Sequence, residues 1–356
     1  MIAVLAWCVG VMLVGVLLGM AYQALGTRRN IQKFPPPGRL VDLGTHRLHI
    51  LESGQGSLTI LLEAGLMSTV LSWTDLQRQL ARSFRVVSYD RSGLGWSDLG
   101  PMPRTADRIV EELHTLLQRA AIPPPYILVG HSFGGLSMPL FAARFPEEVA
   151  GMVLVDPVAP TEWNPPSDEN RKLARIGAKV CRRAAILSRI GLIRFVAFLL
   201  TSEATRKPAA SLVRLISRGT PGESGSVSSP WFAALPANEK AMAAVFWVQP
   251  KFALTIASQL ENLQRSAELA SEIGTFCDKP LVILSAGTAT EHRRLEHAEM
   301  AQRLPTGQHH LAEKSNHWIM QDEPELVVRA IEDVVNRSQI SHADAGFVRT
   351  QTQSHS

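Results

Sequence analysis

The chain has 356 residues, of which 46% are hydrophobic and 19% are charged. This composition excludes a disordered or fibrous chain, and the length suits one α/β catalytic domain with an insertion. The net charge of +4 comes with no nucleic-acid-binding motif, so we expect no nucleic-acid partner. The three cysteines form no CxxC pair, and nothing in the chain implies a metal or an organic cofactor.

The first expected element is an apolar helix at the N-terminus. Residues 2–25 contain no charged side chain, and as a helix they would extend about 36 Å, enough to cross the hydrocarbon core of a bilayer. A cleaved signal peptide is the alternative, but no Lys or Arg precedes the run and the cleavage site at 21–24 is poor. Basic residues follow the run, which favours a cytoplasmic position for the rest of the chain. We expect a single-pass membrane anchor.

Beyond a proline-rich linker, short apolar runs alternate with amphipathic segments. This alternation predicts an α/β fold, with a mostly parallel central sheet and helices on both faces. The expected strands are 48–51, 58–63, 85–89, 126–129, 152–155, 281–285 and 308–312. The expected helices of this part of the chain are 72–82, 105–120, 134–144, 291–304 and 325–335.

The segment between Asp156 and Leu281 is too long for a loop and contains helical stretches at 173–200 and 240–263. We interpret it as a helical cap inserted over the end of the sheet. The residues after Val335 have no apolar period, so we expect disorder there. The expected division of the chain is an anchor at 1–26, a linker at 27–39, a core split into 40–157 and 280–337, a cap at 158–279, and a disordered tail at 338–356.

The strand expected at 126–129 is followed by Gly130-His131-Ser132-Phe133-Gly134, which matches the G-x-S-x-G pattern. A helix follows at once, and a sharp strand-to-helix turn is the context in which this pattern exposes a nucleophilic serine. The glycines leave room for the turn, and the helix N-terminus favours negative charge on the reacting oxygen. We therefore predict that Ser132 is a nucleophile.

A serine hydroxyl needs a base, and in this chain order the base comes last. His317 lies on the loop between the last expected strand and helix, and we predict that it is this base. Two carboxylates compete to orient it. Asp156 ends the strand at 152–155, where an unused carboxylate would be costly, and we favour it. Glu291 follows the strand at 281–285 and is the alternative acid, although it also suits the first turn of an exposed helix.

Two backbone amides are needed to stabilise the oxyanion that forms during attack on a carbonyl. The amide of Phe133, directly after the serine, is expected to supply one. The second is expected from Leu66, or from its neighbour Met67, in the loop that follows the strand at 58–63. Both assignments depend on position in the chain alone.

Four segments together resemble the α/β-hydrolase superfamily. They read GHSFGG at the serine turn, DRSGLGWS after 85–89, GMVLVDP around Asp156, and SNHWIMQDEPELV near the C-terminus. The likeness covers about 40–335, and it implies the α/β-hydrolase fold with a serine-nucleophile, esterase-like activity. Asp156 stands where some haloalkane dehalogenases carry their acid. The chain departs from the family by having Ala64-Gly65 where His-Gly is usual, and by having Ser132 where dehalogenases and epoxide hydrolases have aspartate.

The expected cap is strongly basic. Between Arg171 and Arg218 there are twelve Lys or Arg and one acid, Glu203, interleaved with large apolar residues. Such a segment can rest on an anionic membrane surface, which would fit a hydrophobic or lipid-like ester substrate. A solvated face over core-packed helices is the competing interpretation. The expected activity is ester hydrolysis; an acyltransferase, a C–C hydrolase, a lyase or a non-catalytic binding protein remain alternatives.

Overall fold

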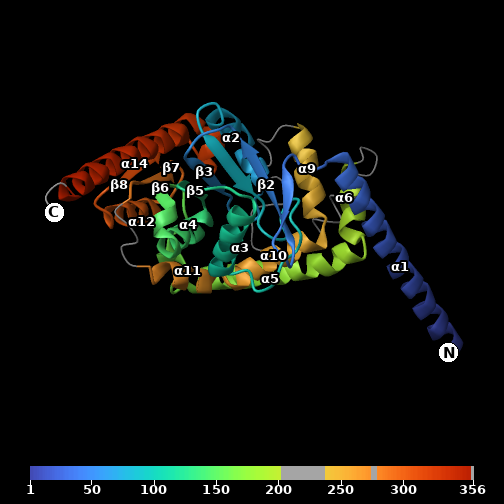
Figure 1. Cartoon of the computed structure of the whole chain (residues 1–356). Coiled ribbons are helices and arrows are strands. Elements are labelled where there is room, and N and C mark those ends of the chain that lie inside the picture. The colour runs from blue at the N-terminus through green and yellow to red at the C-terminus, as the bar shows by residue number, and fades with distance from the viewer. Residues whose placement is uncertain (202–236, 274–278, 354–356) are drawn as a thin grey trace. The chain divides into compact units, whose positions relative to one another are not determined.

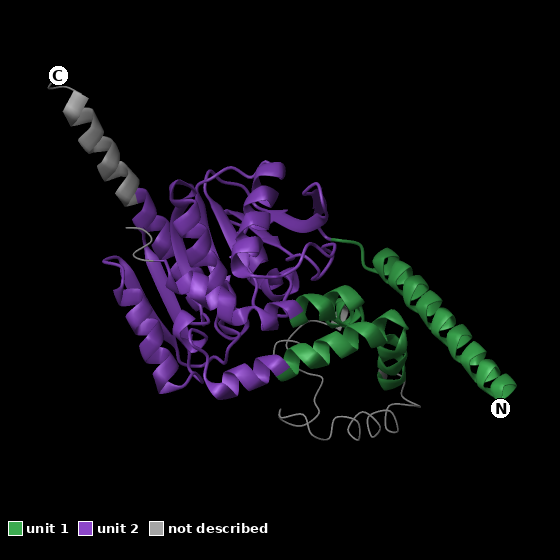
Figure 2. Ribbon diagram, turned by 90° about the horizontal axis from the view of Figure 1, so that it is seen from below, with its two compact units in different colours: residues 1–36, 176–257 green, residues 37–175, 258–356 purple. Residues whose placement is uncertain are grey.

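The computed structural model describes residues 1–201, 237–273 and 279–353, and these fall into two compact units. One unit comprises 37–175 and 258–356, and the other comprises 1–36 and 176–257 (Figure 2). One boundary, at 36/37, lies in the linker, and the other two fall inside helices α5 (Asp168–Arg189) and α10 (Pro250–Glu261). The purple unit in Figure 2 contains the sheet, and we call it the sheet-containing unit; the green unit contains the N-terminal helix, and we call it the helical unit.

An eight-stranded sheet forms the centre of the sheet-containing unit (Figure 1). Its order is β1-β2-β4-β3-β5-β6-β7-β8, and every pairing from β4 to β8 is parallel, whereas β1–β2 and β2–β4 are antiparallel. The mostly parallel sheet expected from the sequence is confirmed. The strands are β1 (Arg39–Asp42), β2 (Arg47–Ser53), β3 (Thr59–Glu63), β4 (Arg85–Tyr89), β5 (Tyr126–His131), β6 (Val149–Val155), β7 (Leu281–Ala286) and β8 (Gly307–Ala312). The short edge strand β1 was not predicted.

The four strands β3, β5, β6 and β7 are buried along their whole length. Parallel strands covered by helices on both faces read as continuous apolar runs, which is why these segments were recognisable in the sequence. In β5, Leu128 faces one apolar core, whereas Ile127 and Val129 face the core on the opposite side of the sheet. The carboxyl end of β5 is therefore fixed from both faces.

Helices cover each face of the sheet. One core contains residues of α3 (Ala106–Arg119), α4 (Gly134–Arg144) and α12 (Glu291–Gln302). The other contains residues of α2 (Thr74–Leu80), α13 (Ile319–Asp322) and α14 (Pro324–Gln353). A further helix, α11 (Leu263–Ser271), packs on α4 and α3. Short 3₁₀ turns complete this unit at η1 (Val70–Trp73), η2 (Pro146–Glu148) and η3 (Pro160–Glu162).

The described part of the helical unit consists of helices. These are α1 (Ile2–Lys33), the C-terminal part of α5, α6 (Leu192–Thr201), α9 (Ala237–Trp247) and most of α10. The helix expected at 173–200 is broken at Gly191, whose φ of +75° is a left-handed conformation that a glycine adopts readily. The segments 158–175 and 258–273, which we assigned to the cap, belong to the sheet-containing unit. The basic residues at 206–218 lie outside the described residues.

The C-terminal tail differs from the prediction of disorder from residue 338. Helix α14 continues to Gln353. Its first part is packed, with Val327, Ile331 and Val334 buried. Adding residues to an existing helix requires no new nucleation, so a segment without an apolar period can continue a helix that packing has started.

Candidate active site

Ser132 stands at the sharp turn between β5 and α4. Its φ of +53° lies in the left-handed region, and its N–H donates to the carbonyl of Val155 on the next strand at 3.1 Å. The turn leaves little space: a Cβ on Gly130 would approach the carbonyl oxygen of Gly134 to 2.8 Å, and one on Gly135 would approach Pro157 Cβ to 2.4 Å. The small residues of the pattern are therefore required by close backbone packing. The strained conformation is maintained by the surrounding sheet and helix.

Asp156 and His317 are brought together from positions 161 residues apart. The Nδ1 atom of His317 lies 2.5 Å from Oδ2 of Asp156, and the Asp156 side chain is almost fully buried. The other carboxylate oxygen accepts a hydrogen bond from the amide of Ala286 on β7 at 3.1 Å. Both carboxylate oxygens are thus fixed, which determines the direction of the imidazole ring.

The electrostatics of Asp156 favour its ionised form. Burial by itself raises the pKa of this carboxyl group, but the hydrogen bond with His317 and the nearby charge of Arg293 outweigh burial and lower the pKa to about 2. Asp156 is therefore a carboxylate at neutral pH. It can hold His317 with its Nδ1 protonated and leave Nε2 free to accept a proton.

Glu291, the alternative acid, is not brought to His317. It is the first residue of α12 and is exposed, directly after Thr290, whose hydroxyl caps the helix by accepting from the amide of Arg293 at 3.3 Å. A carboxylate in the first turn of a helix interacts favourably with the helix dipole. The structure places Asp156, and not Glu291, against the imidazole.

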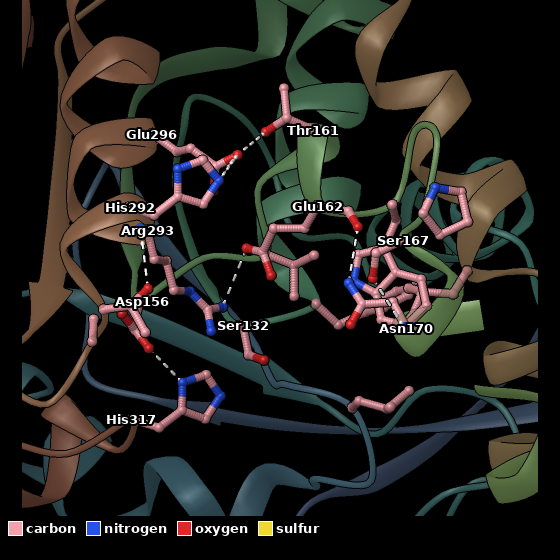
Figure 3. A pocket seen from close by; sticks show the side chains of 18 of the residues that line it. Ser132, Asp156, Thr161, Glu162, Ser167, Asn170, His292, Arg293, Glu296 and His317 are labelled. Carbon is pink, nitrogen blue, oxygen red and sulfur yellow. Dashed lines mark hydrogen bonds and ion pairs between the residues drawn. The ribbon is translucent and has the colours of Figure 1, made fainter. Parts of the chain in front are cut away.

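Ser132, Asp156 and His317 line one cavity of about 960 Å³ (Figure 3). Apolar side chains form part of its wall: Leu66, Phe133, Val158, Trp163, Leu260 and Leu263. Polar side chains from η3 and α12 form another part: Thr161, Glu162, His292, Arg293 and Glu296. Across this polar part, Arg293 approaches Glu162 Oε1 to 3.5 Å and donates to the carbonyl of Pro157 at 3.2 Å.

The segments expected to supply the oxyanion amides both reach the cavity, since Leu66 and Phe133 line it. Met67, the neighbouring alternative, has a φ of +61°. Of the four non-glycine residues with positive φ in the described part of the chain, Ser132 and Asp156 line this cavity, and Met67 directly follows the lining residue Leu66. Backbone strain of this kind concentrates at functional sites. Among the described residues, no group of three His, Cys, Asp or Glu side chains could hold a metal ion.

A model of the alpha/beta hydrolase family matches residues 60–330, which is most of the chain. The chain belongs to this family.

The chain also resembles several curated proteins over shorter segments. It is 38% identical over 104 residues to the uncharacterised protein YqjL of Bacillus subtilis, which is 29% of this chain and 41% of YqjL. It is 30% identical over 118 residues to a 2-(acetamidomethylene)succinate hydrolase of Mesorhizobium japonicum, covering 33% of this chain and 42% of that protein. With mouse epoxide hydrolase 4 it shares 26% identity over 164 residues, covering 42% and 45% of the two chains. The matches span less than half of each relative.

Solved structures show the same fold at low identity. An enol-lactonase from Burkholderia xenovorans LB400 superposes with a TM-score of 0.57 at 18% identity, covering 84% of this chain and 100% of that chain. A putative lipase from Acinetobacter baumannii AYE gives a TM-score of 0.60 at 15% identity, covering 90% and 97%. At these identities the likeness concerns the fold. Together with the family match, it confirms the predicted superfamily and fold class.

The sequence did not predict the roles of two buried residues near the site. Arg91, in the DRSGLGWS segment, donates to Glu63 Oε1 at 2.6 Å and also to the carbonyls of Ala64 and Gly65. Its guanidinium lies 5.3 Å from the centre of the Phe133 ring. Arg91 therefore contacts both segments expected to supply the oxyanion amides. The motif itself was the available signal, but only the fold reveals which carbonyls the arginine binds.

His131 is the second such residue. Its ring is completely buried, and burial holds its pKa well below the usual range, so the ring is neutral. Its Nε2 lies 2.9 Å from the backbone carbonyl oxygen of His317, and the two rings are 4.6 Å apart. As a neutral donor, His131 holds the loop that carries His317. Its position beside the serine gave no indication of this contact.

Proposed function

We propose that this protein is a serine hydrolase that cleaves a carboxylic ester through an acyl-enzyme on Ser132. The observation that carries the proposal is the Asp156–His317 pair beside a serine in a strained turn, all lining one cavity. Family membership supports hydrolysis in general. The serine at the turn is what favours acyl transfer, because attack through an alkyl–enzyme ester requires a carboxylate nucleophile.

In the proposed mechanism, His317 Nε2 removes the hydroxyl proton of Ser132 as the oxygen attacks the ester carbonyl. The amides of Phe133 and Leu66 stabilise the oxyanion, while the Asp156 carboxylate stabilises the charged imidazole. Collapse of the intermediate breaks the ester C–O bond, and His317 gives its proton to the leaving alcohol. Water then attacks the acyl-enzyme, losing a proton to His317, and releases the carboxylic acid and the free serine.

The cavity favours a substrate with an apolar part and a polar part. Leu66, Phe133 and Trp163 offer an apolar wall, whereas Arg293 and Glu162 offer charged groups on the side of η3 and α12. A hydrophobic or lipid-like acyl group on the apolar wall, with the polar end of the molecule toward Arg293, fits this distribution. An acyl chain of this kind is the proposed substrate class.

The proposed location is a membrane, through α1. This is the one described helix that by itself is long and apolar enough to cross a bilayer, and none of its 18-residue apolar window is buried within the protein. An apolar helix with so little of its surface buried in protein is better accommodated by lipid than by water. The bent pair α9–α10 meets the same criterion only when taken together, and it contains buried residues such as Phe246 and Ile256.

The test is labelling of the detergent-solubilised full chain with a fluorophosphonate probe, followed by peptide mapping. We expect the label on Ser132, no label in the Ser132→Ala variant, and strongly reduced labelling in His317→Ala. An unlabelled wild-type protein with intact secondary structure would contradict an activated serine and would favour a non-catalytic role.

Product analysis separates the remaining chemical alternatives. Incubation of the wild-type protein with candidate esters, with and without a competing alcohol, should release the free acid in both cases. Transfer of the acyl group mainly to the alcohol would instead identify an acyltransferase. Turnover of only non-ester substrates would favour a C–C hydrolase or a lyase.

A further inference from the structure

The corner between α5 and α6 carries an apolar stripe within the unit that contains α1. Ile186, Leu187, Leu192 and Phe195 are all exposed, and we refer to them as the α5–α6 stripe. Ile186 is 61% exposed and Phe195 is 49% exposed, which are large fractions for side chains of this size. Exposed apolar residues that gather on one corner indicate a surface that something covers.

Helix α1 packs against this corner by direct backbone contact. A Cβ added to Gly19 would lie 2.2 Å from the carbonyl oxygen of Ile190, and one added to Gly191 would lie 2.6 Å from the carbonyl oxygen of Gly19. Two glycines facing one another let two backbones approach closely, as small residues do at helix contacts in membranes. A groove of about 380 Å³ lies beside the contact, lined by Leu18, Tyr22 and Phe195 among others.

The contact lies on the apolar part of α1. Gly19 precedes Arg28, the first charged residue, by nine positions, which is about 14 Å along the helix axis at the α-helical rise. If Arg28 lies among the lipid headgroups, Gly19 lies inside the hydrocarbon, and the α5–α6 corner lies there with it. The depth of the corner is thus determined by its contact with α1.

Arg194, the charged residue of α6, is satisfied by α1 itself. Its Nε donates to Gln23 Oε1 at 2.9 Å, and one terminal nitrogen donates to Thr27 Oγ1 at 3.1 Å. A guanidinium near lipid is costly unless its donors are paired, and these two partners lie toward the charged end of α1. Exposed cations that precede the stripe on α5, including Lys179 and Arg183, complement anionic headgroups.

We propose that the α5–α6 stripe is embedded in the same membrane leaflet as the C-terminal part of α1, with lipid acyl chains covering it. The occupant of this surface is the bilayer, because the stripe is continuous with the apolar surface of a membrane-spanning helix and is bordered by cations. The inference depends on α1 crossing the bilayer, but it is independent of the chemistry at Ser132.

The test uses the full chain reconstituted at one molecule per lipid nanodisc, where both leaflets are open to solvent. Cys8, Cys181 and Cys277 are replaced by alanine, and single cysteines are introduced as Phe195→Cys, Leu13→Cys or Leu295→Cys. The original side chains at these three positions are 49%, 54% and 57% exposed in the protein, so they are matched. Reaction with a charged maleimide reports access to water, and an attached NBD group reports quenching by doxyl-labelled lipid.

We expect the cysteine at position 195 to react at least tenfold more slowly than that at 295, and its NBD group to be quenched by the labelled lipid. Leu13→Cys, on α1, should behave like Phe195→Cys. Reaction at 195 as fast as at 295, with 13 protected, would overturn the inference while leaving the anchor intact. Rapid reaction at both 13 and 195 would refute the anchor as well. Protection at 195 without lipid quenching would mean that protein covers the stripe, which also contradicts the inference.

A matched pair on α1 tests the backbone contact. Gly19→Leu places a side chain against Ile190, whereas Gly15→Leu has nothing within 4 Å of its Cβ. In the Phe195→Cys background, Gly19→Leu should raise the maleimide rate at least fivefold and Gly15→Leu should leave it unchanged. Equal rates in both would refute the role of the contact. Circular dichroism of each variant verifies that the protein is folded.

Discussion

Replacing Asp156 by asparagine tests the proposed acid most directly. In the protein, one carboxylate oxygen accepts from the Ala286 amide at 3.1 Å and the other lies 2.5 Å from His317 Nδ1. An asparagine that keeps the bond from Ala286 must direct its oxygen to that amide, so its NH₂ group faces His317. A donor in that position favours the imidazole tautomer with the proton on Nε2, which cannot accept the proton of Ser132.

The expected loss follows from this tautomer change. The wrong tautomer in a serine–histidine–aspartate arrangement costs roughly 10⁴-fold in kcat, which is about 5 kcal/mol of transition-state stabilisation. Glu291→Gln is the matched control, because it removes one carboxylate charge from an exposed helix terminus. It should change activity by less than about twofold and stability by at most ~1 kcal/mol.

The assay is the second-order rate of fluorophosphonate labelling, since it requires no knowledge of the natural ester. It is measured at neutral pH, with circular dichroism to verify that each variant is folded. Near-normal labelling of Asp156→Asn together with a large loss in Glu291→Gln would refute the reasoning and identify Glu291 as the acid. Near-normal labelling of both variants would mean that His317 needs neither carboxylate.

Three further outcomes are expected. Ser132 has a φ of +53°, which glycine adopts more readily than alanine. Ser132→Gly should therefore be about 1 kcal/mol more stable to denaturant than Ser132→Ala, although both are inactive. Equal stability would argue against strain at the turn. Arg91→Met leaves Glu63 buried without its cation, so thermal unfolding should show a loss of about 3–5 kcal/mol of stability. Adding Glu63→Gln to Arg91→Met should recover part of this loss. An Arg91→Met variant as stable as the wild type would contradict the importance of the buried pair. The pKa of Asp156 is about 2, below the ordinary 3.8, so its charged form contributes about 2 kcal/mol of stability above pH 4. This contribution disappears as the pH falls from about 4 to about 2. An acid titration of the stability of Asp156→Asn should lack that component.

The sequence by itself determined the elements that have a strong local signal. Continuous apolar runs identified β3, β5, β6 and β7, because strands buried on both faces can carry little else. The strand–GHSFG–helix succession predicted a sharp turn at Ser132, because such a turn requires glycines at fixed offsets. Chain order predicted His317 as the base. The apolar N-terminal run predicted a helix long enough to cross a membrane, since such a helix needs about twenty predominantly apolar residues.

Tertiary structure decided what depends on contacts between distant residues. The choice between Asp156 and Glu291 was open in the sequence, since both follow a strand. Only the parallel pairing of β6 with β7, and of β7 with β8, shows which carboxylate meets the imidazole. The contacts of Arg91 with the Ala64 and Gly65 carbonyls, and of His131 with the His317 carbonyl, involve backbone acceptors that leave no trace in residue identity. The contact of Gly19 with Ile190 likewise joins segments more than 170 residues apart, and no local pattern encodes which backbone a glycine will face.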